Sequence, residues 1–266
     1  MQQNPNTVTG RALLGGVANG HYRRVTYTPD FFKSIGSTAR ASAGVVLPVL
    51  FEVLGTPNTM LDVGCGTGAW LETARQLGVG KVLGVDGAYL PRDQLLLGED
   101  EFLEADLSRP LDLEERFDLA LTLEVAEHLP ESSAPTFVET LCRHADAVVF
   151  SAAVPNQGGE HHVNERLPSY WAELFHLNGF DVFDVIRPRI WDDERVMFYY
   201  RQNILVFAKA AAAEQLRALP AASPLDVVHP QQLAYWHEVG ASEAWPMFLG
   251  SLRRTARAKF ARSFRG

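Results

Sequence analysis

The 266-residue sequence predicts an α/β fold: a Rossmann-like seven-stranded sheet, mostly parallel with an antiparallel last strand, and helices on both faces. Three observations predict it. An apolar run at 60–63 ends in a glycine-rich turn that a helical pattern follows. Further apolar runs alternate with helical patterns, as in parallel sheets. The last two runs, 180–186 and 202–208, have no expected helix between them, so the last strand should be antiparallel.

The strand, turn and helix at 60–77 organise the chain. Gly64, Gly66 and Gly68 lack a Cβ, so the backbone can turn sharply and a ligand can approach it closely. The helix that follows carries Trp70 and Leu71, and Gly78 should end it. Its N-terminus favours negative charge, such as a carboxylate or phosphate. The stretch is therefore expected to bind a nucleotide-like ligand.

The turn alone fits two kinds of ligand. Gly64-x-Gly66-x-x-Ala69 satisfies the dinucleotide pattern, and Asp86 lies about 20 residues on, as an NAD site needs. Asp62 favours the other kind, because a carboxylate repels a pyrophosphate and attracts an ammonium or a sulfonium. An NAD-dependent oxidoreductase remains an alternative that ligand binding would distinguish.

The eight residues Leu61-Asp62-Val63-Gly64-Cys65-Gly66-Thr67-Gly68 resemble the first motif of the class I S-adenosylmethionine-dependent methyltransferases. The resemblance runs from about Leu47 to Lys209. It implies the class I methyltransferase fold with S-adenosylmethionine as cofactor. It also implies cofactor-binding roles for Asp62, Gly64, Cys65, Gly66, Gly68, Asp86, Gly87, Asp106, Leu107 and Glu124.

Asp86, Asp106 and Glu124 lie at or near the carboxyl ends of expected strands, which is where open α/β sheets bind ligands. By the resemblance, Asp86 accepts both ribose hydroxyls, or else caps a helix before Gly87. Asp106 would accept a hydrogen bond from the adenine amine, while Leu107 would pack on the adenine ring. Glu124 would face the methionine end or the substrate.

Apolar periodicity places the other elements. The connection at 187–201 is rich in charged and aromatic residues and should lie near the substrate, or else form an ion-paired hairpin. Strands are expected at 81–86, 101–107, 117–124, 147–154, 180–186 and 202–208. Helices are expected at 42–54, with Pro48 as a kink, and at 133–144, 168–178, 210–219 and 229–240.

The chain divides into three parts. Residues 1–42 are expected to form an N-terminal arm and a helical lid built of short helices. Residues 43–210 form the S-adenosylmethionine-binding methyltransferase domain, and 211–266 a C-terminal helical extension with a basic tail. The tail at 247–266 holds six cations and no acid, so it is expected to contact an anionic surface: a membrane, an acidic partner or the other subunit of a homodimer.

Charge and composition exclude several classes. The formal net charge of −8 argues against nucleic acid as a partner of the whole chain. Cys65 and Cys142 make no disulfide framework, which suits a cytoplasmic protein. No apolar run is expected to span a bilayer, and the polar N-terminus does not resemble a signal peptide.

Two segments carry candidate catalytic residues. The run from Glu124 to Leu129 resembles the post-strand motif of many small-molecule methyltransferases, and His128 in it would take a proton or hold the loop. The loop at 155–165 resembles a Gly-Gly-x-x-His-Val-Asn-Glu signature found near sugar and natural-product pathways. This loop either caps the next helix or supplies a general base, for which His162 ranks above His161.

A divalent-metal site using His161 or His162 with Glu165 ranks below these interpretations, because the spacing does not establish a coordination shell; no metal is assigned. The predicted function is S-adenosylmethionine-dependent methylation, with O-methylation of a small polar metabolite favoured because a hydroxyl needs a base. N-methylation is the alternative. A non-catalytic scaffold tethered by its basic tail is another.

Overall fold

The computed structural model describes residues 29–213, 216 and 224–238. The polar arm at 1–28, the basic tail at 239–266 and most of the expected helix at 210–219 lie outside these residues. Within that helix, residues 210–213 form a turn.

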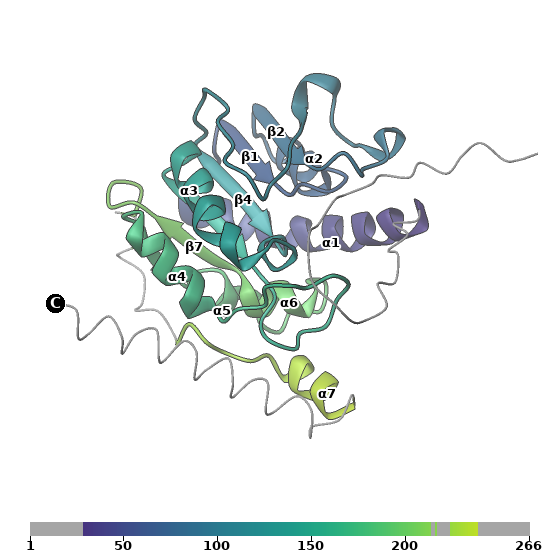
Figure 1. Ribbon diagram of the computed structural model, residues 1–266, viewed down its shortest axis with the longest axis vertical. Helices are drawn as coiled ribbons and strands as arrows, with labels where there is room; N and C mark the ends of the chain where they lie inside the picture. Colours follow the sequence, from purple (N-terminus) through teal and green to yellow (C-terminus); the bar gives the residue numbers. More distant parts are fainter. Residues whose placement is uncertain (1–28, 214–215, 217–223, 239–266) are drawn as a thin grey trace, which may run out of the picture.

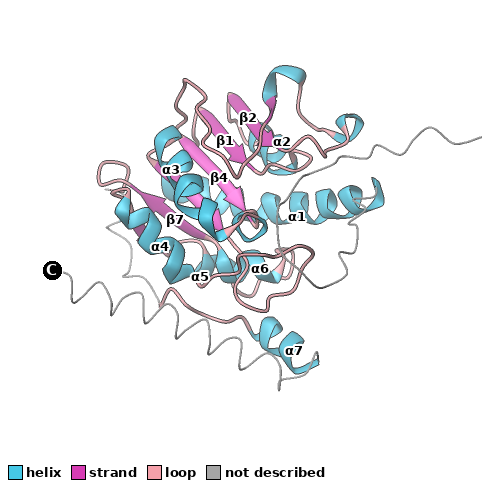
Figure 2. Cartoon of the chain, viewed as in Figure 1, coloured by secondary structure: helices cyan, strands magenta, loops and turns pink. Residues whose placement is uncertain are grey.

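Seven strands form one sheet in the order β3-β2-β1-β4-β5-β7-β6. Strand β7 is antiparallel to β5 and β6, and the other pairs are parallel (Figure 2), so the predicted fold class is confirmed. The strands are β1 Thr59–Val63, β2 Lys81–Asp86, β3 Phe102–Glu104, β4 Leu119–Leu123, β5 Ala147–Ser151, β6 Asp181–Phe183 and β7 Leu205–Ala208.

Helices cover both faces of the sheet and create two cores (Figure 1). Alternate residues of β4 enter different cores: Leu119 and Leu121 face α1 and α2, while Ala120 faces α3 and α4. Strands β4 and β5 are buried throughout, as expected for central parallel strands. The helices are α1 Pro29–Leu54, α2 Ala69–Gln76, α3 Ala134–His144, α4 Pro168–Leu177, α5 Arg187–Ile190, α6 Phe198–Asn203 and α7 Pro230–Glu238.

Helix α1 is longer than expected. It begins at Pro29 and continues through residue 42, so from residue 29 onward the expectation of separate short helices is wrong, and the expected domain boundary falls inside α1. By length and composition alone, Gly36–Leu54 could cross a membrane, which corrects the expectation that no stretch is long enough. Its Leu47 and Leu50 are buried in the core.

The connection between β6 and β7 contains two short helices, α5 and α6, and not the helix-free hairpin that was expected. The apolar side chains of Ile190, Val196 and Tyr200 explain this difference, because all three pack into the core beside α1. The antiparallel insertion of β7 is still confirmed, because a helical connection of this length can also reverse the chain.

Arg187, at the start of α5, is buried with 1% of its surface exposed. It pairs with Asp184 through two hydrogen bonds of 2.9 and 2.7 Å. It also donates to the carbonyl oxygens of Gln202, Leu225 and Pro224 at 3.0, 2.9 and 3.3 Å. One guanidinium therefore joins β6, the end of α6 and the segment that leads into α7.

Helix α7 lies against the loop after β5, although the sequence places it outside the catalytic fold. Trp236 Nε1 and Gln232 Nε2 both donate to the Asn156 carbonyl, at 2.6 and 3.0 Å. A Cβ on Gly158 would lie 2.7 Å from the Tyr235 hydroxyl, so the glycine lets the two elements approach closely. The described part of the C-terminal extension thus supports the loop that carries the candidate histidines.

Candidate active site

The glycines of the turn between β1 and α2 serve different purposes. A Cβ on Gly64 would lie 2.3 Å from Val125 Cγ2, and one on Gly68 would lie 2.5 Å from Leu97 Cγ. The protein's own packing therefore requires both glycines. Gly66 has a φ of 54°, and a Cβ there would meet nothing within 4 Å. The open space that a ligand needs is thus at Gly66.

Asp86 lies beside this turn, at the end of β2. Its carboxylate accepts hydrogen bonds from the Gly66 N–H and the Gly87 N–H, both at 2.7 Å. The Tyr89 hydroxyl also donates to Asp86 Oδ1, although Tyr89 is 56% exposed. A ligand whose hydroxyls bind Asp86 would displace Tyr89, a contact that the sequence pattern did not reveal.

Asp62 is buried in β1, with 2% of its surface exposed. Burial, reinforced by the nearby charge of Asp86, raises the pKa of Asp62 well above its usual value. Burial also raises the pKa of Asp86, against the opposing effect of the hydrogen bonds it accepts. A cation in this site would relieve the repulsion between the two carboxylates.

Cys65 contributes a core side chain. Its thiol packs near Gly84, where a Cβ would lie 2.7 Å from the sulfur. Burial raises the pKa of the thiol well above its usual value, so the sulfur is not a nucleophile. A ligand contact at this position would therefore come from the Cys65 backbone.

Asp106 and Leu107 follow β3, as predicted. The exposed Asp106 carboxylate accepts from the N–H and hydroxyl of Ser108 at 3.0 and 2.6 Å, and pairs with Arg109 at 3.1 Å. The hydrogen bonds from Ser108, with Arg109 nearby, lower the pKa of Asp106, which keeps it an acceptor. Leu107 is half-buried and packs against the core under α3 and α4.

Glu124 follows β4 with a φ of 57°, a backbone strain that is common at functional sites. Its carboxylate accepts from the amides of Gln157 at 2.5 Å and Asn203 at 3.1 Å. Asn203 also donates to Gln157 at 2.7 Å. Burial raises the pKa of Glu124. The two amides were not predicted, because one is in the loop after β5 and the other ends α6.

Two adjacent tyrosines of α6 close this side of the site. Tyr200 is buried edge-on against Trp70, with ring centroids 5.3 Å apart. Burial, and then the nearby Tyr199, Glu124 and Asp62, raise the pKa of Tyr200 well above its usual value. Burial and the nearby Glu124 raise the pKa of Tyr199 to about 12. The sequence signal was the stretch at 187–201, which is rich in charged and aromatic residues; its predicted position near the substrate stays a prediction.

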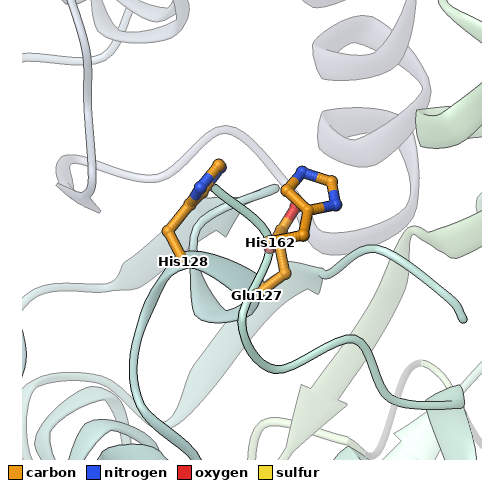
Figure 3. Close-up of side chains that lie close together, drawn as sticks. All are labelled: Glu127, His128 and His162. Atoms are coloured by element: carbon orange, nitrogen blue, oxygen red, sulfur yellow. The ribbon is translucent and has the colours of Figure 1, made fainter. Parts of the chain in front are cut away.

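Beyond Glu124, the structure brings Glu127, His128 and His162 together (Figure 3). One ligand atom from each lies within 4.8 Å of the other two. The two imidazoles meet edge to face, with centroids 4.9 Å apart. His162 Nδ1 bonds to Glu165 Oε1 at 2.9 Å, and Glu165 Oε2 accepts from the Asn156 N–H at 2.7 Å. The predicted histidine and acid of the loop are thus paired.

The other members of the loop are placed differently. His161, with a φ of 59°, is exposed and does not belong to this cluster. The Glu127 carbonyl accepts from the N–H groups of Val163 and Asn164 at 2.8 and 3.0 Å, which fixes the loop on the turn after β4. The expected capping of the next helix does not come from the residue directly before α4, which makes no side-chain cap.

The electrostatics of the cluster are unusual. Glu127 is 0% exposed, and no side chain in the described part of the chain donates a hydrogen bond to its carboxylate, although the backbone of Glu127 and of Ala153 lies close to it. Burial, then the charge of Glu124, raise the pKa of Glu127 well above its usual value. Burial of the imidazole, and then the nearby His162, lower the pKa of His128 to about 4, although the residue keeps an exposed edge.

Acids therefore line the site from the glycine turn to the histidines. Asp62, Asp86 and Glu127 are buried and Glu124 is half-buried, and removal from solvent raises the pKa of each. Such a site favours a cationic ligand and disfavours a pyrophosphate. This agrees with the prediction that was based on Asp62 alone.

Solved structures share the fold at low sequence identity. A sugar N-methyltransferase from a Streptoalloteichus species is 15% identical with a TM-score of 0.53, covering 76% of this chain and 99% of that one. Human N-acetylserotonin methyltransferase, in complex with S-adenosylmethionine, is 17% identical with a TM-score of 0.44; the match covers 67% of this chain and 55% of that one. An O-methyltransferase family protein from Burkholderia thailandensis is 14% identical with a TM-score of 0.48, covering 67% and 59%.

This chain thus spans little more than half the length of the human and Burkholderia proteins. No curated protein sequence matches it. A family described as a methyltransferase domain matches residues 38–184, which is more than half of the chain. The matched range contains the glycine turn, the buried acids and the histidine cluster. The chain therefore belongs to this methyltransferase domain family.

Proposed function

We propose that this protein is an S-adenosylmethionine-dependent methyltransferase that methylates a hydroxyl group of a small polar metabolite, such as a sugar or a natural-product intermediate. The observation that carries the proposal is the set of acids with raised pKa values, Asp62, Asp86, Glu124 and Glu127, together with the adjacent imidazoles of His128 and His162. The acids suit a cationic methyl donor, and we assign the acceptor to the space beside the two histidines.

The residues of the site fit S-adenosylmethionine. Gly66 leaves open space in the turn. The Asp86 carboxylate accepts a hydrogen bond from the Tyr89 hydroxyl, as it would from a ribose hydroxyl. Asp62 and Glu124 supply negative charge for the ammonium and sulfonium end. Asp106 would accept from the adenine amine. When bound, this cofactor supplies a methyl group that is already activated on sulfur.

The histidine cluster supports a hydroxyl acceptor. A hydroxyl oxygen is a poor nucleophile until its proton is removed or its O–H bond is polarised, whereas a neutral amine attacks directly. The pairing of Glu165 with His162 orients that imidazole for such a role. In the balanced reaction the new O–C bond forms as the C–S bond breaks, S-adenosylhomocysteine leaves, and the hydroxyl proton passes to solvent. The alternative is N-methylation, the activity for which the Streptoalloteichus protein is named.

Calorimetric titration of the full chain tests the cofactor. We expect S-adenosylmethionine and S-adenosylhomocysteine to bind and NAD not to bind. Binding of NAD alone would overturn the proposal. A subsequent acceptor screen with matched hydroxyl and amine compounds tests the acceptor class. Turnover of amines only would replace O-methylation with N-methylation, and no turnover with any acceptor would favour a non-catalytic protein.

Asp62→Asn is expected to stabilise the ligand-free protein and weaken S-adenosylmethionine binding. Because the native pKa of Asp62 is raised, the folded state binds more protons, and its stability falls as pH rises above about 4. The variant should therefore melt about 2–4 °C higher at pH 7, and the difference should vanish below about pH 4. The affinity should fall about 10–100-fold.

Thermal unfolding from pH 3.5 to 7.5 and calorimetry measure these effects. Asp100→Asn, an exposed acid in a turn, is the control that should change neither quantity. A lower melting temperature for Asp62→Asn at pH 7 would show that this carboxylate stabilises the fold and is not held there for a ligand.

His162→Ala is expected to lower kcat about 10²–10⁴-fold. Its affinity for S-adenosylmethionine should stay within about twofold, because the proposal places the ring at the acceptor and not at the cofactor. Steady-state kinetics and calorimetry separate the two effects. His176→Ala changes an exposed histidine of α4 and serves as the control. Equal losses in turnover and cofactor affinity would remove His162 from the acceptor site.

A further inference from the structure

We propose that Glu127, His128 and His162 form a binding site for a first-row divalent transition metal, and that the acceptor hydroxyl binds to this metal. The metal site itself stands on the geometry of the three side chains. Only the role of the metal toward an acceptor rests on the proposed function.

The arrangement of ligand atoms is close to that of a coordination shell. One carboxylate oxygen and one nitrogen from each imidazole lie within 4.8 Å of one another. Ligand atoms about 2.0–2.2 Å from one ion are separated by roughly 3–4 Å, so small side-chain rotations would close the shell. Figure 3 shows His128 rising from the same turn as Glu127, with the ring of His162 facing both from the opposite loop.

Glu127 supplies the independent reason for a cation. Its side chain is fully buried, and no side chain in the described part of the chain donates a hydrogen bond to either oxygen. The backbone of Glu127 and of Ala153 lies close enough to lower the pKa of the carboxylate, but burial and the nearby charges of Glu124 and Glu165 raise it. A buried carboxylate is costly and is normally paired with a charge or bound to a metal. A bound cation would offset the negative charge of Glu127 and of the two acids near it.

The surroundings of His162 are those of a metal-bound imidazole. Its Nδ1 is engaged by Glu165 at 2.9 Å, which leaves Nε2 as the ligand atom. Carboxylates commonly orient metal-bound histidines in this way. In Figure 3 Nε2 lies on the side of His128. A Cβ on Gly159 would lie 2.3 Å from Nε2, so only a glycine lets the loop backbone pass this close to the His162 ring.

The ligand set indicates which metals fit. Two imidazoles and one carboxylate suit Mn²⁺, Fe²⁺, Co²⁺ or Zn²⁺, whereas Mg²⁺ prefers oxygen ligands. Three protein ligands leave positions for water or an acceptor oxygen. A hydroxyl bound there would lose its proton to solvent more easily, and the resulting oxygen anion would attack the methyl group. His162 then binds the metal, and no histidine needs to take the proton.

Titration of the full chain with MnCl₂ after removal of metals by a chelator tests the site. We expect one Mn²⁺ to bind the wild type and a Co²⁺ derivative to show visible absorption. Glu127→Gln keeps the shape of the side chain and should weaken Mn²⁺ binding at least about 100-fold, because it removes the only anionic ligand. His176→Asn is the control: it changes an exposed histidine of α4 that is not part of the cluster and should bind Mn²⁺ like the wild type.

Thermal unfolding provides a second readout that a folding defect would not imitate. In chelator, Glu127→Gln should melt at the same temperature as the wild type or higher, since the buried charge is gone. With Mn²⁺ at 100 times its Kd, the wild type should melt about 5–10 °C higher, and the variant should not respond. Failure of Mn²⁺, Co²⁺ and Zn²⁺ to bind, or equal binding to Glu127→Gln, would overturn the site.

The metal site and the proposed function can fail separately. Binding of S-adenosylmethionine to chelator-treated protein reports on the methyltransferase, independently of the metal. If this cofactor binds but no metal does, only the metal site is wrong. If Mn²⁺ binds but methylation of a hydroxyl acceptor persists unchanged in chelator, the site stands and its role toward the acceptor is wrong.

Discussion

Gly66→Ala is expected to lower the affinity for S-adenosylmethionine about 10–100-fold while the protein remains folded. A Cβ at this position meets no protein atom within 4 Å, so it projects into the space assigned to the cofactor. Forcing an extra methyl group into a filled site costs about 1–3 kcal/mol, which corresponds to that loss of affinity. Calorimetric titration measures the affinity, and thermal unfolding measures the remaining stability.

Gly64→Ala is the matched comparison. Both glycines have positive φ values, 54° at Gly66 and 87° at Gly64, so both variants carry a backbone cost of roughly 1–2 kcal/mol. Only the Cβ at position 64 would overlap a neighbour, Val125 Cγ2 at 2.3 Å. We therefore expect Gly64→Ala to melt well below Gly66→Ala. If Gly66→Ala bound the cofactor like the wild type, the open space at the turn would not be the cofactor site.

The features predicted correctly depend on short stretches of sequence. Strand β2 has the predicted bounds, Lys81–Asp86, because its apolar run ends sharply at an acid and a glycine. Helix α2 ends before Gly78, whose φ of 101° suits only glycine. The sheet order follows once strands and helices alternate and the last strand is inserted antiparallel.

The features that were missed depend on contacts distant in sequence. Tyr89 bonds to Asp86 only because its loop folds back over Gly87. Gln157 and Asn203 meet at Glu124 because β5 lies next to both β4 and β7. No single pattern in the sequence marks either amide as a partner of that acid.

The histidine cluster was predicted in part. The pairing of His162 with Glu165 lies within one turn of loop and could be expected from their spacing. The approach of Glu127 and His128 requires β4 and β5 to be parallel neighbours, so that the segments after them meet at one edge of the sheet. The two loops predicted from the sequence therefore contained His128 and His162, but only the fold shows that Glu127 lies beside them.

Arg187→Met is expected to lower the free energy of unfolding by about 3–5 kcal/mol, the largest change in stability that we expect from one substitution. Both members of the Arg187–Asp184 pair have 2% of their side-chain surface exposed. Methionine occupies similar space but leaves the Asp184 carboxylate buried without its partner. Three carbonyl oxygens, including that of Gln202, also lose a donor. Denaturant titration measures the loss.

Two further variants separate the buried charge from lost packing. Arg195→Met removes a pair of similar geometry, in which Arg195 bonds to Asp193 at 2.9 and 2.6 Å, but Arg195 is exposed, so no measurable change in stability is expected. Adding Asp184→Leu to Arg187→Met should recover part of the stability, because it removes the uncompensated charge. A double variant as unstable as the sum of its single changes would show that Arg187 acts through the Pro224 and Leu225 carbonyls, by anchoring the segment before α7, and not through Asp184.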